Sequence, residues 1–128
     1  MSAAEVDLIT FTDADYAQAF RYQLTSTPTY YDFTSCQLLM EVRKLAEDVE
    51  VFLSLTSTFS GIAPGSSGID ISTGDDGKPS IFTIVIARAA LAEIPEGDYV
   101  QSLILVTPDG LHSDLWRGTF TNSVGPTR

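Results

Sequence analysis

The stretch that decides the fold class is residues 87–120, ARAALAEIPEGDYVQSLILVTPDGLHSDLWRGTF. Its first part, 88–94, reads as one helical turn, which a proline and a glycine end directly afterwards. Residues 98–107 follow as a long apolar-rich strand, and Pro108-Asp109-Gly110 fits a type I turn whose glycine is the left-handed residue of a bulge. The chain then returns through Trp116-Arg117-Gly118. We therefore expect a short helical turn leading into a β-hairpin, without a catalytic motif.

In the rest of the chain, apolar residues recur mainly with a period of two, which is typical of half-buried β-strands. The segments with this pattern are 6–11, 16–24, 36–43, 51–56 and 69–71. Residues 81–86 carry apolar side chains on both faces, which predicts a strand buried between two layers. Together with the hairpin, the segments give about seven or eight strands, and we expect one antiparallel β-sandwich domain over residues 1–128.

Composition supports one folded domain. The chain has 128 residues, of which 44% are hydrophobic and 19% charged, so it has enough apolar material for a core. The single cysteine, Cys36, excludes an intrachain disulfide and a cysteine cluster for zinc, and we expect it to be a small core residue. The N-terminus lacks the pattern of a secretory signal, and no apolar run is long enough to span a bilayer. We expect a protein made and kept in a cytoplasm.

The charge balance narrows the choice of partners. Seventeen acidic residues against seven basic ones give a formal net charge of −10, which repels polyanions. The basic residues are scattered along the chain and form no stripe. We therefore expect neither nucleic acid nor a membrane surface as a partner.

The candidate chemical motifs are weak. His112, Ser113 and Asp114 are adjacent on a predicted strand, where neighbouring side chains point to opposite faces, so they cannot line up as a catalytic triad. The loop at 75–78 lacks the alternating acidic ligands and the closing glutamate of an EF-hand, and no phosphate-binding glycine motif is present. We expect no enzyme activity, no cofactor and no metal site.

Three patches carry a resemblance to a known group of proteins. They are Asp32-Phe33-Thr34 with the strand that ends at Arg43, the approach 91–100, and the segment from Pro108 through Trp116-Arg117-Gly118 to the closing Thr127-Arg128. In this order they resemble small structural proteins of tailed-bacteriophage virions. That resemblance implies an immunoglobulin-like sandwich, found at baseplates, tail tips, necks and fibre bases, that acts through protein–protein contacts. It also implies a virion location, other virion proteins as partners, and a symmetric homo-oligomer.

Interface residues can be proposed from residue type. Aromatic side chains and arginine are enriched at interface hot spots, so the candidates are Tyr30, Tyr31, Trp116, Arg117 and Arg128. Trp116 has a second interpretation, in which it packs under the sheet while Gly118 allows a bulge or a close contact. The terminal segments 1–5 and 124–128 are expected to be flexible tails or tails that order on docking.

Two other functions remain open at this stage. One is a capsid decoration protein that binds the outer shell at local symmetry axes. The other is a carbohydrate-binding module of a host-attachment device, in which Trp116 or the pair Tyr30-Tyr31 would stack on a sugar ring.

Overall fold

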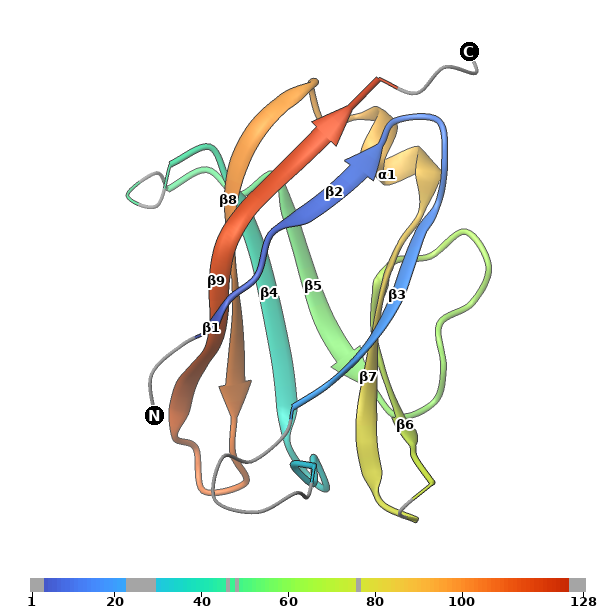
Figure 1. Cartoon of the computed structure of the whole chain (residues 1–128), viewed down its shortest axis with the longest axis vertical. Coiled ribbons are helices and arrows are strands. Elements are labelled where there is room, and N and C mark those ends of the chain that lie inside the picture. The colour runs from blue at the N-terminus through green and yellow to red at the C-terminus, as the bar shows by residue number, and fades with distance from the viewer. Residues whose placement is uncertain (1–3, 23–29, 46, 48, 76, 125–128) are drawn as a thin grey trace.

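The computed structural model describes residues 4–22, 30–45, 47, 49–75 and 77–124. This part of the chain is almost entirely β, with one short helix (Figure 1). The elements in chain order are β1 (Ala4–Glu5), β2 (Leu8–Phe11), β3 (Tyr16–Arg21), β4 (Gln37–Arg43), β5 (Leu53–Thr58), β6 (Gly68–Thr73), β7 (Pro79–Ile86), α1 (Arg88–Ala92), β8 (Gly97–Val106) and β9 (His112–Ser123). The predicted all-β class and the helical turn before the hairpin are confirmed.

The strands form one curled, barrel-like sheet. Their order is β1-β9-β8-β4-β5-β6-β7-β3, and β2 also pairs with β9. In Figure 1, β9, β8, β4 and β5 lie on one side of the molecule, and β3, β7 and β6 lie on the other. The two sides join where β5 runs parallel to β6, at Ser57↔Ile69 and Thr58↔Asp70. Most pairings are antiparallel as predicted, whereas β1 and β2 are parallel to β9, a pairing between the two ends of the chain.

The predicted β8–β9 hairpin is confirmed in detail. Gly110 has a φ of +88°, its N–H donates to the Thr107 carbonyl at 2.9 Å, and the Thr107 N–H donates to the Leu111 carbonyl at 2.9 Å. Further along, Leu103 pairs with Trp116 but Ile104 pairs with Asp114, so Leu115 is an extra residue on β9. This bulge breaks the alternation of faces, and both Leu115 and Trp116 are buried.

Strand β7 corrects one prediction. Its side chains alternate strictly between buried and half-buried positions, so it is not covered on both faces. Phe82, Ile84 and Ile86 point into the core, whereas Ile81 and Val85 lie on the outer face. Apolar outer residues hid the period of two in the sequence, because β-branched side chains suit a strand surface even where it is half exposed.

The core between the two sides is rich in aromatic rings. Trp116 packs edge-on against Phe20, with ring centroids 4.8 Å apart, and is 5.6 Å from Phe82. Phe33 meets Phe82 edge-on at 5.5 Å. Cys36 is also buried, as predicted. These contacts link β3 and β7 on one side to β9 on the other.

A buried asparagine anchors the short helix. The side-chain amide of Asn122, on β9, donates to the carbonyls of Leu91 and Ile94 at 3.0 and 2.9 Å, and its oxygen accepts from the Thr10 hydroxyl at 2.9 Å. At the other end of α1, the Arg88 N–H donates to the Asp15 carboxylate at 2.6 Å. Five residues are too few for a stable isolated helix, so these long-range bonds hold α1 in place.

The N-terminal chain lies against β9 at Gly118, between β1 and β2. Strands β1 and β2 keep the same register against β9, with the segment Val6-Asp7 between them. A Cβ atom at Gly118 would overlap the Val6 carbonyl oxygen and lie 2.7 Å from its carbon. Of the two alternatives expected at this glycine, a bulge or a close contact, the close contact is present, and it lets the N-terminal strand lie against β9.

Candidate interaction surfaces

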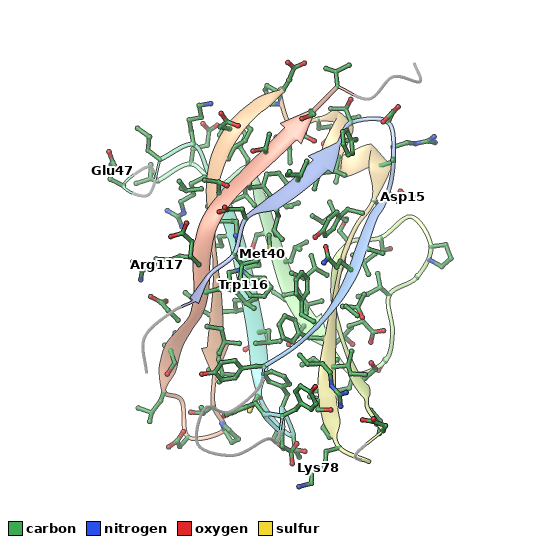
Figure 2. The ribbon with its side chains drawn as sticks, in the orientation of Figure 1. Asp15, Met40, Glu47, Lys78, Trp116 and Arg117 are labelled. Atoms are coloured by element: carbon green, nitrogen blue, oxygen red, sulfur yellow. The ribbon has the colours of Figure 1, made fainter. Side chains whose placement is uncertain are left out.

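The five interface candidates do not form one patch. Figure 2 shows Trp116 in the core and Arg117 pointing outward from β9. Trp116 is only 5% exposed, and its indole N–H donates to the Gln101 side-chain oxygen at 2.7 Å. Its placement matches the alternative in which it packs under the sheet, because the bulge at Leu115 turns the indole inward. A covered indole cannot stack on a sugar or a partner, so we leave Trp116 out of the proposed contact surface.

Gln101 is the buried partner of that indole. Its side-chain nitrogen donates to the Val6 carbonyl at 2.6 Å, while its oxygen accepts from Trp116. Both polar ends of the amide are thus satisfied inside the structure. This pair ties the core to the N-terminal strand, and it supports the outer surface above it.

Arg117 lies at a groove on the outer face of β4, β8 and β9. The groove encloses about 600 Å³, and Val100, Ser102 and Thr119 are among its uncharged lining residues. Its charged lining comprises four carboxylates and two guanidinium groups, on Glu5, Asp7, Glu41, Arg43, Asp114 and Arg117. We call this the β9 groove.

Ion pairs set the charge of the β9 groove. Arg43 bonds Glu41 at 2.8 Å on β4, and Arg117 bonds Asp114 on β9. The Arg117 side chain remains 68% exposed. With Glu5 and Asp7 added, the groove carries an excess of negative charge and suits a partner with basic or hydrogen-bond-donating groups.

Tyr30 and Tyr31 lie elsewhere, between β3 and β4. The Arg21 guanidinium lies 3.8 Å from the centroid of the Tyr30 ring, and Arg21 also bonds Asp75 at 2.9 Å. Tyr31 is half-buried, with its ring 5.0 Å from that of Phe33. Burial raises the pKa of Tyr31, and the nearby Cys36 and the charge of Asp109 raise it further. Tyr31 therefore lies near the β8–β9 turn and Tyr30 lies beside Arg21, and we treat the two neighbouring tyrosines as a second candidate surface.

Two carboxylates order the loops of this second surface. Asp32 accepts bonds from the hydroxyl and the N–H of Thr34, at 2.5 and 2.9 Å, and both lower the pKa of Asp32. Asp109 accepts from the Thr107 hydroxyl, which lowers the pKa of Asp109. Both are local bonds of turn residues, so these aspartates have a structural function at neutral pH.

The other candidates from the sequence lie on β9 or outside the described residues. His112 and Asp114 lie two residues apart on β9 with Ser113 between them, as expected. Within the described residues, no three His, Cys, Asp or Glu side chains gather as a metal site, and no helix is long and apolar enough to cross a membrane. Arg128 lies outside the described residues, as do the tail residues 1–3 and 125–128.

The sequence missed most of the β9 groove. Glu41 and Arg43 could be read as the polar face of a strand, but the other charged residues come from the two ends of the chain. Glu5 and Asp7 reach the groove only because β1 and β2 pair in parallel with β9. A pairing between distant segments leaves no local pattern in one sequence.

The buried thiol gives a first prediction. Cys36 is 6% exposed, and burial raises the pKa of its thiol. Because the thiolate is the reactive form, we expect the folded protein at about pH 8 to react with Ellman's reagent at least ~100-fold more slowly than a free cysteine. Denaturant should restore the full rate. Rapid labelling of the folded protein would contradict the buried position.

Comparison with known proteins adds no assignment. No model of a known protein family matches the chain, and no curated protein matches it either.

Proposed function

We propose that the protein is a non-enzymatic structural component of a tailed-bacteriophage virion, which acts by protein–protein contacts in the tail, baseplate or neck. The virion assignment rests on the sequence resemblance described above. The observation that carries the contact role is the β9 groove, an open surface lined by four carboxylates and two arginines, beneath which Gln101 bonds Trp116 and the Val6 carbonyl. The excess carboxylates of the groove accept bonds from a basic partner, and Arg117, which is exposed beside Asp114, adds a donor at the edge of the contact.

The same proposal includes an immunoglobulin-like sandwich of the variable type. The pairing of β9, β8, β4 and β5 on one side and β3, β7 and β6 on the other corresponds to strands G, F, C, C′ and strands B, E, D of that fold. Tyr99 also supports the immunoglobulin-like proposal, because its hydroxyl donates to the carbonyl of Pro95, four residues upstream, at 2.6 Å. A tyrosine bonded in this way near the start of strand F is the tyrosine corner of such folds.

The tyrosine corner can be tested by stability. Tyr99 is 4% exposed, so Tyr99→Phe leaves the Pro95 carbonyl without its buried hydroxyl partner. We expect the free energy of unfolding to fall by about 1 kcal/mol in urea titrations. Tyr30→Phe is the control, because it keeps an exposed ring over Arg21 and removes only its hydroxyl, so it should change stability by less than ~0.5 kcal/mol. Equal effects of the two variants would argue against the corner.

The virion role is tested in assembled particles. We expect the protein to be present in purified virions, and tail and capsid fractions will separate a tail location from capsid decoration. Loss of one arginine hot spot weakens binding by ~10-fold or more, so Arg117→Ala should lower incorporation strongly. Tyr31→Ala tests the second surface in the same way.

The control for this experiment is Arg88→Ala. Arg88 is an exposed arginine on α1, away from the residues that line the β9 groove. Thermal unfolding of each variant must first match that of the wild type. Normal incorporation of Arg117→Ala and Tyr31→Ala would refute these sites, whereas absence of the wild-type protein from virions would refute the virion role.

A further inference from the structure

Strand β3 is an unprotected edge of the sheet. It stands at the end of the strand order, and among the described residues it pairs only with β7. That pairing runs through six consecutive residue pairs without a bulge. Edge strands usually carry a charge, a proline or a bulge that prevents pairing with another chain. The first five residues of β3, Tyr16-Ala17-Gln18-Ala19-Phe20, have none of these.

The edge is also sterically open. Ala17, Gln18 and Ala19 are exposed, and two of the three are small. Ala17 and Ala19 share the outer face with Thr83 and Val85 of β7, whereas Phe20 packs against Trp116 on the inner face. A second backbone can therefore approach β3 along its whole length and continue its ladder.

The sequence of this edge is complementary to itself. In an antiparallel pair centred on Gln18, Ala17 lies opposite Ala19 of the other copy and Tyr16 lies opposite Phe20. The same register sets Asp15 opposite Arg21, so each end of the pair joins a carboxylate to a guanidinium. Asp15 already bonds the Arg88 N–H, and Arg21 already bonds Asp75, but carboxylate and guanidinium groups each accept or donate further bonds.

The opposite edge of the sheet lacks this complementarity. Strand β1 and the segment after it carry Glu5 and Asp7, and two copies meeting there would bring like charges together. In a chain with a net charge of −10, an uncharged edge with complementary ends is the position where a second copy meets the least repulsion.

We propose that β3 is a homodimer contact, in which two copies pair antiparallel about a two-fold axis at Gln18. The result is a continuous sheet in the order β6-β7-β3-β3-β7-β6 across the two copies. This inference rests on the proposed contact function and names a second copy of the chain as one partner. The β9 groove of each copy remains available for a different partner protein.

Cysteine cross-linking tests the contact and its register. Directly opposite residues lie within disulfide reach, whereas diagonal neighbours lie about 7–8 Å apart. Gln18→Cys should therefore form a disulfide-linked dimer on mild oxidation. Ala17→Cys and Ala19→Cys should each cross-link poorly alone but efficiently when mixed. Cys36 is buried and serves as the internal control in every variant.

Mass measurement completes the test. By light scattering, the wild type should have about twice the 13.9 kDa mass of one chain. Gln18→Lys sets two like charges opposite each other and should give a monomer, whereas Ala89→Lys, on the exposed face of α1, should leave the dimer intact. A monomeric wild type without Gln18→Cys cross-links, or a dimer unaffected by Gln18→Lys, would overturn the β3 contact. A β3 dimer that is absent from virions would instead overturn only the virion role.

Discussion

Replacing Gly118 with alanine is expected to lower the free energy of unfolding by about 3 kcal/mol, because the new methyl group overlaps the backbone of Val6. The N-terminal strand must move away from β9, and two bonds would weaken with it. These are the bond from the Gln101 side chain to the Val6 carbonyl and the bond from the Val6 N–H to the Arg117 carbonyl. Urea titration measures the loss, and limited proteolysis should cleave near the N-terminus first.

Two controls isolate the steric cause. Thr119→Ala changes the exposed neighbour on β9 and should cost less than ~0.5 kcal/mol. In a chain shortened by residues 1–7, the obstacle is gone, so Gly118→Ala should cost almost nothing. A large loss of stability in the shortened chain would show that the glycine is needed for the conformation of β9 itself and not for its close contact with Val6.

Replacing Asn122 with leucine is expected to lower the free energy of unfolding by about 2–4 kcal/mol. The side chain is fully buried, and its loss removes the amide donor of the Ile94 carbonyl. The Leu91 carbonyl then keeps the Ile94 N–H, at 3.2 Å, and the Thr10 hydroxyl keeps only its longer bond to the Thr121 carbonyl, at 3.4 Å. Each buried polar group that loses its partner costs about 1–3 kcal/mol. Because α1 depends on this bond pair, hydrogen exchange of its amides should rise more than that of the core strands.

A double-mutant cycle with Thr10 checks this reading. Thr10→Val alone removes one bond to Asn122 and should cost about 1 kcal/mol. In the Asn122→Leu background the hydroxyl keeps only its 3.4 Å bond to the Thr121 carbonyl, so the same change should cost less than ~0.5 kcal/mol. Additive costs would contradict the direct coupling of the two side chains.

Local patterns predicted the strands well wherever one face is buried. In β4 the residues predicted on the inner face, Leu38, Met40 and Val42, are buried, whereas Gln37, Glu41 and Arg43 on the other face are not. The β8–β9 turn was equally predictable, because Pro108-Asp109-Gly110 favours a type I turn with a left-handed glycine, and Gly110 adopts that conformation. The outer face of β7 escaped prediction, because its isoleucine and valine residues are compatible with either environment.

The candidate surfaces were less predictable than the strands. Arg117 was found from residue type and does lie on an exposed surface, but Trp116 beside it is in the core. The difference arises at one extra residue, Leu115, since a bulge reverses which side chains of β9 face inward. Nothing in the sequence marks the position of that bulge.

The sequence by itself determined the all-β class, the positions of most strands and the geometry of the hairpin, because these depend on side-chain alternation and on backbone preferences within a few residues. Only the tertiary structure decided the parallel pairing of β1 and β2 with β9, the close contact of Gly118 with Val6, the charged lining of the β9 groove and the open edge of β3. Each of these depends on contacts between segments far apart in the chain. Such contacts are selected by the packing of the whole core and leave no local signature.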